Sequence, residues 1–237
     1  MTKPNLMPTS RSAKAPHVAS NGKCFSLVPA AAQQQMYRTL ASLKLPSAAA
    51  TGAEVAEIAA CLAIGEADPV IVCGTALGAR SVRRRRTVAV KKFAASGGVL
   101  AAATVSATAA LITDAKATAL VCGDRLQPDE DYRGVFSFAA RHKLPILYLV
   151  SNSLTTGRRQ ELDLRTLYAE FGIPVFSVDA NDAIAAYRVT TEALHNARHS
   201  RGPCVIEALT FGSKGISKPD TLELLRSYME RHGNWPV

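Results

Sequence analysis

The sequence predicts an α/β domain whose parallel sheet is covered by helices on both faces. Short, uninterrupted apolar runs alternate with segments of helical periodicity from residue 117 onward. Strands that are apolar along their whole length are typical of parallel sheets buried on both faces. The 237 residues are 48% apolar and 20% charged, which is enough for a substantial core. The same composition excludes a largely disordered chain.

The first part of the chain predicts an arm followed by two helices. Residues 1–30 are rich in proline, serine, asparagine and lysine. We therefore expect a flexible basic arm over residues 1–30 and one α/β domain over residues 31–237. Apolar side chains at helical spacing predict helices over residues 33–45 and 51–64.

The region from residue 70 to 112 combines a short strand pattern with a long alanine-rich segment. An apolar run between turn residues predicts a strand over residues 70–74. Residues 79–95 are expected to form a basic connector. The alanine-rich segment from residue 97 to 112 has side chains that are small for a strand, so we predict a buried helix there.

From residue 117 the alternation of strand and helix becomes regular. The predicted strands cover residues 117–122, 144–150, 173–178 and 203–210. The predicted helices cover residues 131–142, 162–171, 183–199 and 222–232. Ligands of such sheets bind at the carboxyl ends of the strands, so the segments that follow these strands are where we expect a functional site.

The positive charge of the chain is concentrated in two segments. The formal net charge is +9, and residues 1–53 contain six lysines and arginines and no acidic residue. Residues 80–92 hold seven more, including the run Arg83–Arg86. We expect this run to be a solvated loop, and binding of phosphate or nucleic acid through residues 80–92 is the alternative. Nucleic acid is the less favoured partner, because no nucleic-acid-binding motif or interleaved aromatic residues accompany the run.

The cysteine pattern predicts buried, reduced thiols in a cytoplasmic protein. The five cysteines are scattered singly, without a Cys-x-x-Cys pair. A nucleophilic cysteine is the alternative. No apolar stretch is long enough for a membrane span, and the start of the chain lacks the apolar core of a secretory signal. The cysteines are Cys24, Cys61, Cys73, Cys122 and Cys204.

Polar residues follow the predicted strands in a pattern that suits a cation. Gly123-Asp124 comes after one strand and Ser151-Asn152-Ser153 after the next. A third polar segment, residues 211–217, follows the last strand. Carboxylate, amide and hydroxyl oxygens brought together at one sheet edge form a hard-oxygen site of the kind that Mg²⁺ prefers.

These motifs also carry a family resemblance. Gly123-Asp124-Arg125, Lys143-Leu144-Pro145 and Asn152-Ser153 occur in order, with Asp124 and Ser153 29 residues apart. The segments 168–182 and 201–208 match further family patterns. The sequence thus resembles the alpha subunits of the thiamine-diphosphate-dependent 2-oxo acid dehydrogenases, which include the pyruvate, branched-chain and acetoin dehydrogenases. The resemblance is densest over residues 117–220.

The resemblance implies a thiamine-diphosphate-binding fold with a defined set of site residues. It places Asp124, Ser153 and the main-chain carbonyl of Thr155 on Mg²⁺, which bridges to the cofactor diphosphate. It places Gly123, Asp124, Arg125, Asn152 and Ser153 in the cofactor-binding region. The implied reaction is oxidative decarboxylation of a 2-oxo acid with acyl transfer to a lipoyl carrier. A beta-type subunit of a heterotetramer would supply the glutamate that activates the cofactor.

The departures from the family pattern fall on the chemistry. Arg125 stands where the family has a third glycine, and Ser153 stands where it has a metal-binding asparagine. In the loop after the last strand, Gly212 and Ile216 replace an arginine and a histidine. The chain is also shorter than family members, and the missing part lies between Gly74 and Ser96. We therefore assign no catalytic residue and expect activity that is reduced or lost.

Two alternatives remain open at this point. The chain is either a degenerate enzyme subunit or a noncatalytic subunit or scaffold that keeps the fold for assembly with a partner or with itself. In a further variant, Arg125 and the arginine run bind the diphosphate directly through charge-assisted hydrogen bonds and replace the charge of the metal.

Overall fold

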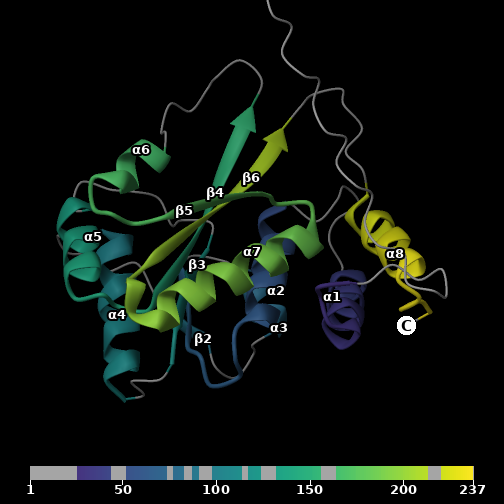
Figure 1. The fold of residues 1–237 in the computed structure, drawn as a ribbon, viewed down its shortest axis with the longest axis horizontal. Helices are drawn as coiled ribbons and strands as arrows, with labels where there is room; N and C mark the ends of the chain where they lie inside the picture. Colours follow the sequence, from purple (N-terminus) through teal and green to yellow (C-terminus); the bar gives the residue numbers. More distant parts are fainter. Residues whose placement is uncertain are drawn as a thin grey trace, which may run out of the picture.

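The described part of the chain contains one sheet of six parallel strands (Figure 1). The computed structural model describes residues 26–43, 52–73, 77–82, 87–90, 98–113, 117–123, 132–155, 164–212 and 220–236. The strand order is β2–β1–β3–β4–β6–β5, and every neighbouring pair is parallel. The strands are β1 (Val70–Cys73), β2 (Thr87–Val90), β3 (Ala119–Cys122), β4 (Ile146–Thr155), β5 (Val175–Asp179) and β6 (Cys204–Gly212). The predicted fold class is confirmed.

Helices cover both faces of the sheet. Helices α2 and α7 pack on one face, called here the α2/α7 face, and α4, α5 and α6 pack on the other, the α4/α5 face. Helices α1 and α8 contact each other and lie beyond α2 (Figure 1). The helices are α1 (Ala30–Ser42), α2 (Gly52–Ala63), α3 (Leu77–Val82), α4 (Val99–Thr113), α5 (Tyr132–Arg141), α6 (Leu164–Ala169), α7 (Ala183–Asn196) and α8 (Thr221–Arg231). A short π-helix, Ala197–Arg201, continues α7.

The core has two halves because side chains alternate along each strand. On β4, Leu147 and Leu149 join the cluster on the α2/α7 face, and Tyr148 and Val150 join the cluster on the α4/α5 face. All four side chains are buried. This alternation is why the strands appear in the sequence as continuous apolar runs: both faces exclude water, so neither alternate set of side chains is polar.

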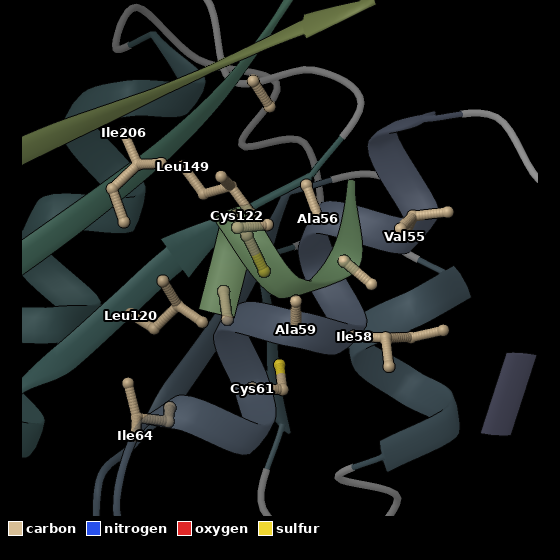
Figure 2. Packing of buried hydrophobic residues seen from close by; sticks show 14 of the residues in the cluster. Val55, Ala56, Ile58, Ala59, Cys61, Ile64, Leu120, Cys122, Leu149 and Ile206 are labelled. Atoms are coloured by element: carbon tan, nitrogen blue, oxygen red, sulfur yellow. The ribbon is translucent and has the colours of Figure 1, made fainter. Parts of the chain in front are cut away.

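The α2/α7 half of the core depends on small side chains. Figure 2 shows Ala56, Ala59 and Cys61 of α2 among the larger residues that line the strands. Small residues on a helix let its axis approach the sheet closely, and the neighbouring leucines and isoleucines fill the remaining space. Helix α2 is accordingly buried along most of its length.

The expectation of a connector over residues 79–95 is wrong in part. The segment contains the second half of α3 and the whole of β2. Strand β2 lies at one edge of the sheet and pairs with β1 from Val70↔Thr87 to Cys73↔Val90. An edge strand of four residues is held by backbone hydrogen bonds to one neighbour, so it needs no long apolar run. The flanking arginines and lysines obscured its pattern in the sequence. The run Arg83–Arg86 lies outside the described residues.

Helix α4 is less buried than the sequence indicated. Leu100, Ala103 and Ala107 face the sheet, but Val105 is 68% exposed and Ile112 is 80% exposed. The expected helix is present, but it is buried only on the side that faces the sheet. The segment is apolar on all sides, so its periodicity could not distinguish the buried side. At 15 residues α4 is the longest helix described, and none of the described helices has both the length and the hydrophobicity to cross a membrane.

The chain contacts the domain before the first helix begins. Val28 is buried, and the Ser26 hydroxyl lies 2.9 Å from the Tyr228 hydroxyl of α8. The buried Gln33 side chain donates to the Val28 carbonyl at 2.7 Å and accepts from Asn234 at 3.1 Å. Residues 26–30, which the sequence placed in the arm, thus lie against the folded domain. The rest of the predicted arm, residues 1–25, lies outside the described residues.

The buried carboxylate of Asp68 links the segments that precede β1 and β3. The Asp68 carboxylate accepts from the Gly65 amide at 2.5 Å, the Thr118 amide at 2.8 Å and Arg198 Nη2 at 2.6 Å. Asp68 precedes β1, Thr118 precedes β3 and Arg198 lies in the π-helix after α7. One buried carboxylate therefore connects three segments at the end of the sheet opposite the candidate site.

Replacing Asp68 with asparagine is expected to destabilise the fold by about 2–3 kcal/mol, because the new amide turns one acceptor into a donor that faces at least one other donor, the Thr118 amide. Arg198 is half-exposed and can regain water, which limits the loss. Urea unfolding followed by circular dichroism measures the effect. The matched control is Glu230→Gln in the exposed Arg226–Glu230 pair, where we expect no measurable change. If both substitutions changed the free energy of unfolding equally, the hydrogen bonds of Asp68 would add no more stability than an exposed ion pair.

Candidate functional site

The carboxyl end of β3 is built on a glycine that no other residue can replace without movement. Gly123 follows β3 with φ +145°, a conformation that side chains rarely allow. A Cβ at this position would lie 1.9 Å from the carbonyl oxygen of Cys73 at the end of β1. The backbones at the ends of β3 and β1 are therefore in direct contact. Asp124 and Arg125, which follow Gly123, lie outside the described residues.

The neighbouring strand β4 extends further than the sequence indicated. The β3–β4 ladder ends at Cys122↔Leu149, but the β4–β6 ladder continues to Thr155↔Gly212. The structure thus places Ser151, Asn152, Ser153 and Thr155 in one strand that continues past the end of β3. The side chains of Ser153 and Thr155 lie outside the described part of the chain, and only their backbone is placed.

Asn152 is held by β6 at two points. Its side-chain nitrogen donates to Glu207 Oε1 at 2.7 Å, and its carbonyl oxygen accepts from the Thr210 hydroxyl at 3.5 Å. Of the residues that the sequence proposed, Gly123 and Asn152 are described in full. They lie at the carboxyl ends of adjacent strands.

Glu207 is the centre of a polar network on the α4/α5 face. It is 8% exposed, and its second oxygen accepts from the Ser177 hydroxyl of β5 at 2.6 Å. Ser177 in turn accepts from Arg165 of α6, at 3.1 Å from Nη2. Burial raises the pKa of the nearby Tyr168 hydroxyl, and the charges of Tyr148 and Glu207 raise it further. Tyr168 therefore stays protonated and is not an acid or base at neutral pH.

The network around Glu207 was not among the predicted site residues. One signal could have indicated it: Glu207 is the single charged residue in the otherwise apolar segment from Cys204 to Leu209. A charged residue in a buried strand requires hydrogen-bond partners. The identity of those partners, Asn152 and Ser177, depends on the strand order and could not be read from the sequence.

The end of β5 is occupied by its own turn. Asp179 accepts from the backbone and side-chain nitrogens of Asn181 at 2.9 and 3.1 Å. Asp182 caps α7 by accepting from the Ala185 amide at 2.9 Å. A small cavity of about 110 Å³ lies beside this turn, between α7 and α8. Within the described residues no group of three histidine, cysteine, aspartate or glutamate side chains could hold a metal ion, and Asp124 is not among those residues.

The described cysteines are buried free thiols, as predicted. Cys61 and Cys122 lie among apolar side chains of α2 and the strands (Figure 2). Burial raises the pKa of Cys122, and the proximity of Cys61, Glu57 and Cys73 raises it further. Burial also raises the pKa of Cys204 to about 11. A protonated, buried thiol is a poor nucleophile, which disfavours the alternative of a nucleophilic cysteine at these positions. Cys24 lies outside the described residues.

We expect the stability of the protein to fall as the pH rises from about 9 to about 11. Burial raises the pKa of the Cys204 thiol above its value in the unfolded chain, so the protonated thiol contributes its full stability below the unfolded-state pKa. That contribution is lost as the pH rises through the folded-state pKa. Urea midpoints measured under reducing conditions across this range test the expectation. In Cys204→Ser the slope of midpoint against pH should be shallower, because serine does not titrate there. Identical slopes in the two proteins would contradict the assignment.

Comparison with known proteins places this chain in a family. Residues 47–235 match the family model of the dehydrogenase E1 component. The chain belongs to the dehydrogenase E1 component family. The predicted relationship to the alpha subunits of the thiamine-diphosphate-dependent 2-oxo acid dehydrogenases is thereby confirmed.

Relatives of this chain include E1 alpha subunits of bacterial pyruvate dehydrogenases. The chain is 34% identical over 100 residues to the pyruvate dehydrogenase E1 component subunit alpha of Acholeplasma laidlawii, a match that covers 40% of this chain and 29% of that protein. It is 30% identical over 138 residues to the corresponding subunit of Staphylococcus epidermidis, covering 48% and 37%. These matches span about a third of the length of the relatives.

One solved structure is also similar to this E1-family chain. It is the X-ray structure of a proposed thiamin diphosphate-dependent enzyme from Mycobacterium smegmatis, with a TM-score of 0.49 and 19% identity. The match covers 68% of this chain and 32% of that one.

Proposed function

We propose that this chain is an alpha-type subunit of a thiamine-diphosphate-dependent 2-oxo acid dehydrogenase that retains the diphosphate site. The observation that carries the proposal is the close contact of Gly123 with Cys73, which keeps the turn between β3 and Asp124 in a form open only to glycine. Asp124 is the next residue in the sequence, and the resemblance expects it to be a magnesium ligand. The E1 family membership and the similarity to pyruvate dehydrogenase alpha subunits support the same proposal.

The residues at this edge fit a magnesium diphosphate in chemical type. The Asp124 carboxylate, the Ser153 hydroxyl and the Thr155 carbonyl are hard oxygen donors, and Mg²⁺ commonly keeps further positions for phosphate oxygens. Arg125 is the second residue after Gly123 in the sequence and would add a cation. Guanidinium groups bind phosphate oxygens through charge-assisted hydrogen bonds. When bound, the cofactor supplies the electron sink for decarboxylation, and the chain supplies binding and orientation.

We further propose that turnover is reduced. Ile216 occupies the position of the family's loop histidine and Gly212 the position of its arginine. Isoleucine can neither donate a proton nor donate a hydrogen bond to a developing anion. A beta-type subunit would supply the activating glutamate, and a lipoyl carrier would accept the acyl group. Most of the loop that carries Ile216, residues 213–219, lies outside the described residues.

A noncatalytic subunit or scaffold is the second candidate. The two-sided core and the six-stranded sheet are intact, and the departures from the family pattern fall on the positions that perform the chemistry. A chain that keeps only the fold would be expected to show this combination.

Calorimetric titration of thiamine diphosphate separates the two candidates. The cofactor is titrated with and without Mg²⁺ into the chain, and into the chain mixed with any beta-type protein encoded beside it. Magnesium-dependent binding, followed by slow decarboxylation of 2-oxo acids, supports the dehydrogenase subunit. Absence of binding in every mixture would overturn the proposal and favour the noncatalytic subunit.

A further inference from the structure

We infer that Glu207 is a positioning residue for the cofactor site. It holds Asn152, and through Asn152 it holds the end of β4 from Ser153 to Thr155, which carries two of the three proposed magnesium ligands. In its link to the cofactor this inference rests on the proposed function. The link between Glu207 and the end of β4 rests on geometry alone and can be tested separately.

The first argument is that β6 alone can hold this part of β4 within the described sheet. The β3–β4 ladder ends at Cys122↔Leu149, so β4 has no described strand on its β3 side beyond that point. On its other side β4 pairs with β6 through Asn152↔Leu209 to Thr155↔Gly212. A slip of one residue in this ladder would turn every side chain of the segment to the opposite face. The position of residues 153–155 therefore depends on the register between β4 and β6.

The second argument is that side chains of β6 fix this register at Asn152. Glu207 Oε1 accepts from the Asn152 side chain at 2.7 Å, and the Thr210 hydroxyl donates to the Asn152 carbonyl at 3.5 Å. Asn152 directly precedes the segment 153–155. Both the side chain and the backbone of Asn152 are thus anchored to β6. After a one-residue slip the contact with Glu207 could not form, because the Asn152 side chain would lie on the α2/α7 face.

The third argument is that burying a carboxylate at this position costs free energy that apolar packing cannot offset. Glu207 is 8% exposed and stands in a strand whose neighbouring residues, Ile206 and Ala208, are buried and apolar. Burying a charge is unfavourable unless hydrogen bonds compensate for the lost water. Both oxygens of Glu207 are used: one accepts from Asn152 and the other from Ser177, which Arg165 supports in turn.

The experiment compares Glu207→Leu, Glu207→Gln and the control Glu170→Gln. Leucine keeps the size of the side chain and removes both acceptors. Glutamine can still accept from Asn152 and can donate to Ser177, so it should restore the link. Glu170 is a half-exposed carboxylate that follows α6 and pairs with Arg133 of α5. Magnesium-dependent binding of thiamine diphosphate is measured by calorimetry, and the thermal midpoint of each variant is recorded beside it.

We expect Glu207→Leu to weaken cofactor binding by at least about tenfold, as observed when residues that orient metal ligands are removed. Glu207→Gln and Glu170→Gln should bind within about threefold of the unchanged protein. Rescue by glutamine separates positioning from a mere need for a filled core, since leucine fills the same space. Unchanged binding in Glu207→Leu would overturn the inference. If that variant does not fold, Glu207→Met takes its place, since methionine also removes both acceptors, with the same expected loss and the same overturning result.

A spectroscopic measurement makes the outcome independent of the cofactor. Protein labelled with ¹⁵N only at asparagine shows the side-chain amide of Asn152, which the variant Asn152→Ala identifies by its disappearance. We expect this signal to exchange slowly with solvent in the unchanged protein and in Glu207→Gln, and to lose its protection in Glu207→Leu. If the unchanged protein binds no cofactor, the proposed function fails. The amide signal still tests whether Glu207 holds the Asn152 side chain. A signal that Glu207→Leu leaves unchanged would overturn the inference.

Discussion

Replacing Asp124 with alanine is expected to abolish magnesium-dependent binding of thiamine diphosphate, with an affinity loss of at least about 100-fold. Asp124 is the single carboxylate in the proposed ligand set, and a hydroxyl and a carbonyl oxygen cannot compensate for its charge. Without Mg²⁺, the negative charge of the diphosphate would be less well neutralised at the carboxyl ends of the strands. The measurement is a calorimetric titration of the cofactor with and without Mg²⁺.

The control for this substitution is Glu192→Ala, which removes the same charge from an exposed position on α7. It should leave cofactor binding unchanged. Magnesium-dependent binding that survives in Asp124→Ala would show that the cation is held elsewhere. Binding that needs no magnesium and disappears in Arg125→Ala would instead favour direct recognition of the diphosphate by Arg125.

Replacing Gly123 with alanine is expected to destabilise the protein by more than about 3 kcal/mol, enough to lose the cofactor site as well. The added Cβ would lie 1.9 Å from the carbonyl oxygen of Cys73, with two further backbone atoms of Cys73 at 2.7 and 2.9 Å. Backbone atoms at the end of a strand cannot move aside as a flexible side chain can. The φ of +145° adds strain for any residue with a Cβ. Urea unfolding followed by circular dichroism measures the loss.

Gly134 provides a matched control for the Gly123 substitution. It lies on the exposed side of α5, and a Cβ there would meet no atom within 4 Å. Gly134→Ala is therefore expected to stabilise the protein by about 0.5–1 kcal/mol, because alanine loses less conformational entropy in a helix. Substitutions with equal effects at the two glycines would contradict the close contact of β3 with β1.

The fold class was predictable because buried parallel strands leave a local signature. The cores of β3 and β4 are continuous apolar runs, and in β6 the segment from Cys204 to Leu209 is interrupted only by Glu207. This pattern depends on burial of both faces. The edge strand β2 was missed for the opposite reason. It has one neighbour, and its four residues stand between basic runs, so its pairing with β1 is a property of the assembled sheet.

The motifs of the candidate site were predictable from the sequence, but the hydrogen bonds that hold Asn152 in place were not. Gly123-Asp124 and Asn152-Ser153 could be recognised from residue types and spacing alone. Glu207 was missed as the partner of Asn152, and Ser177 as the second partner of Glu207, because 55 residues separate Asn152 from Glu207 and 30 separate Ser177 from Glu207. Their meeting depends on the strand order β4–β6–β5.

By itself, the sequence determined the α/β class, the family and the polar residues at the ends of the strands, since all three depend on residue types at short or fixed spacing. Only the tertiary structure decided that Gly123 contacts Cys73, that β4 continues to Thr155 and that Glu207 anchors Asn152. The physical reason is that these contacts join different strands: strand order and register determine which distant backbones and side chains meet, and neither is encoded in any one segment.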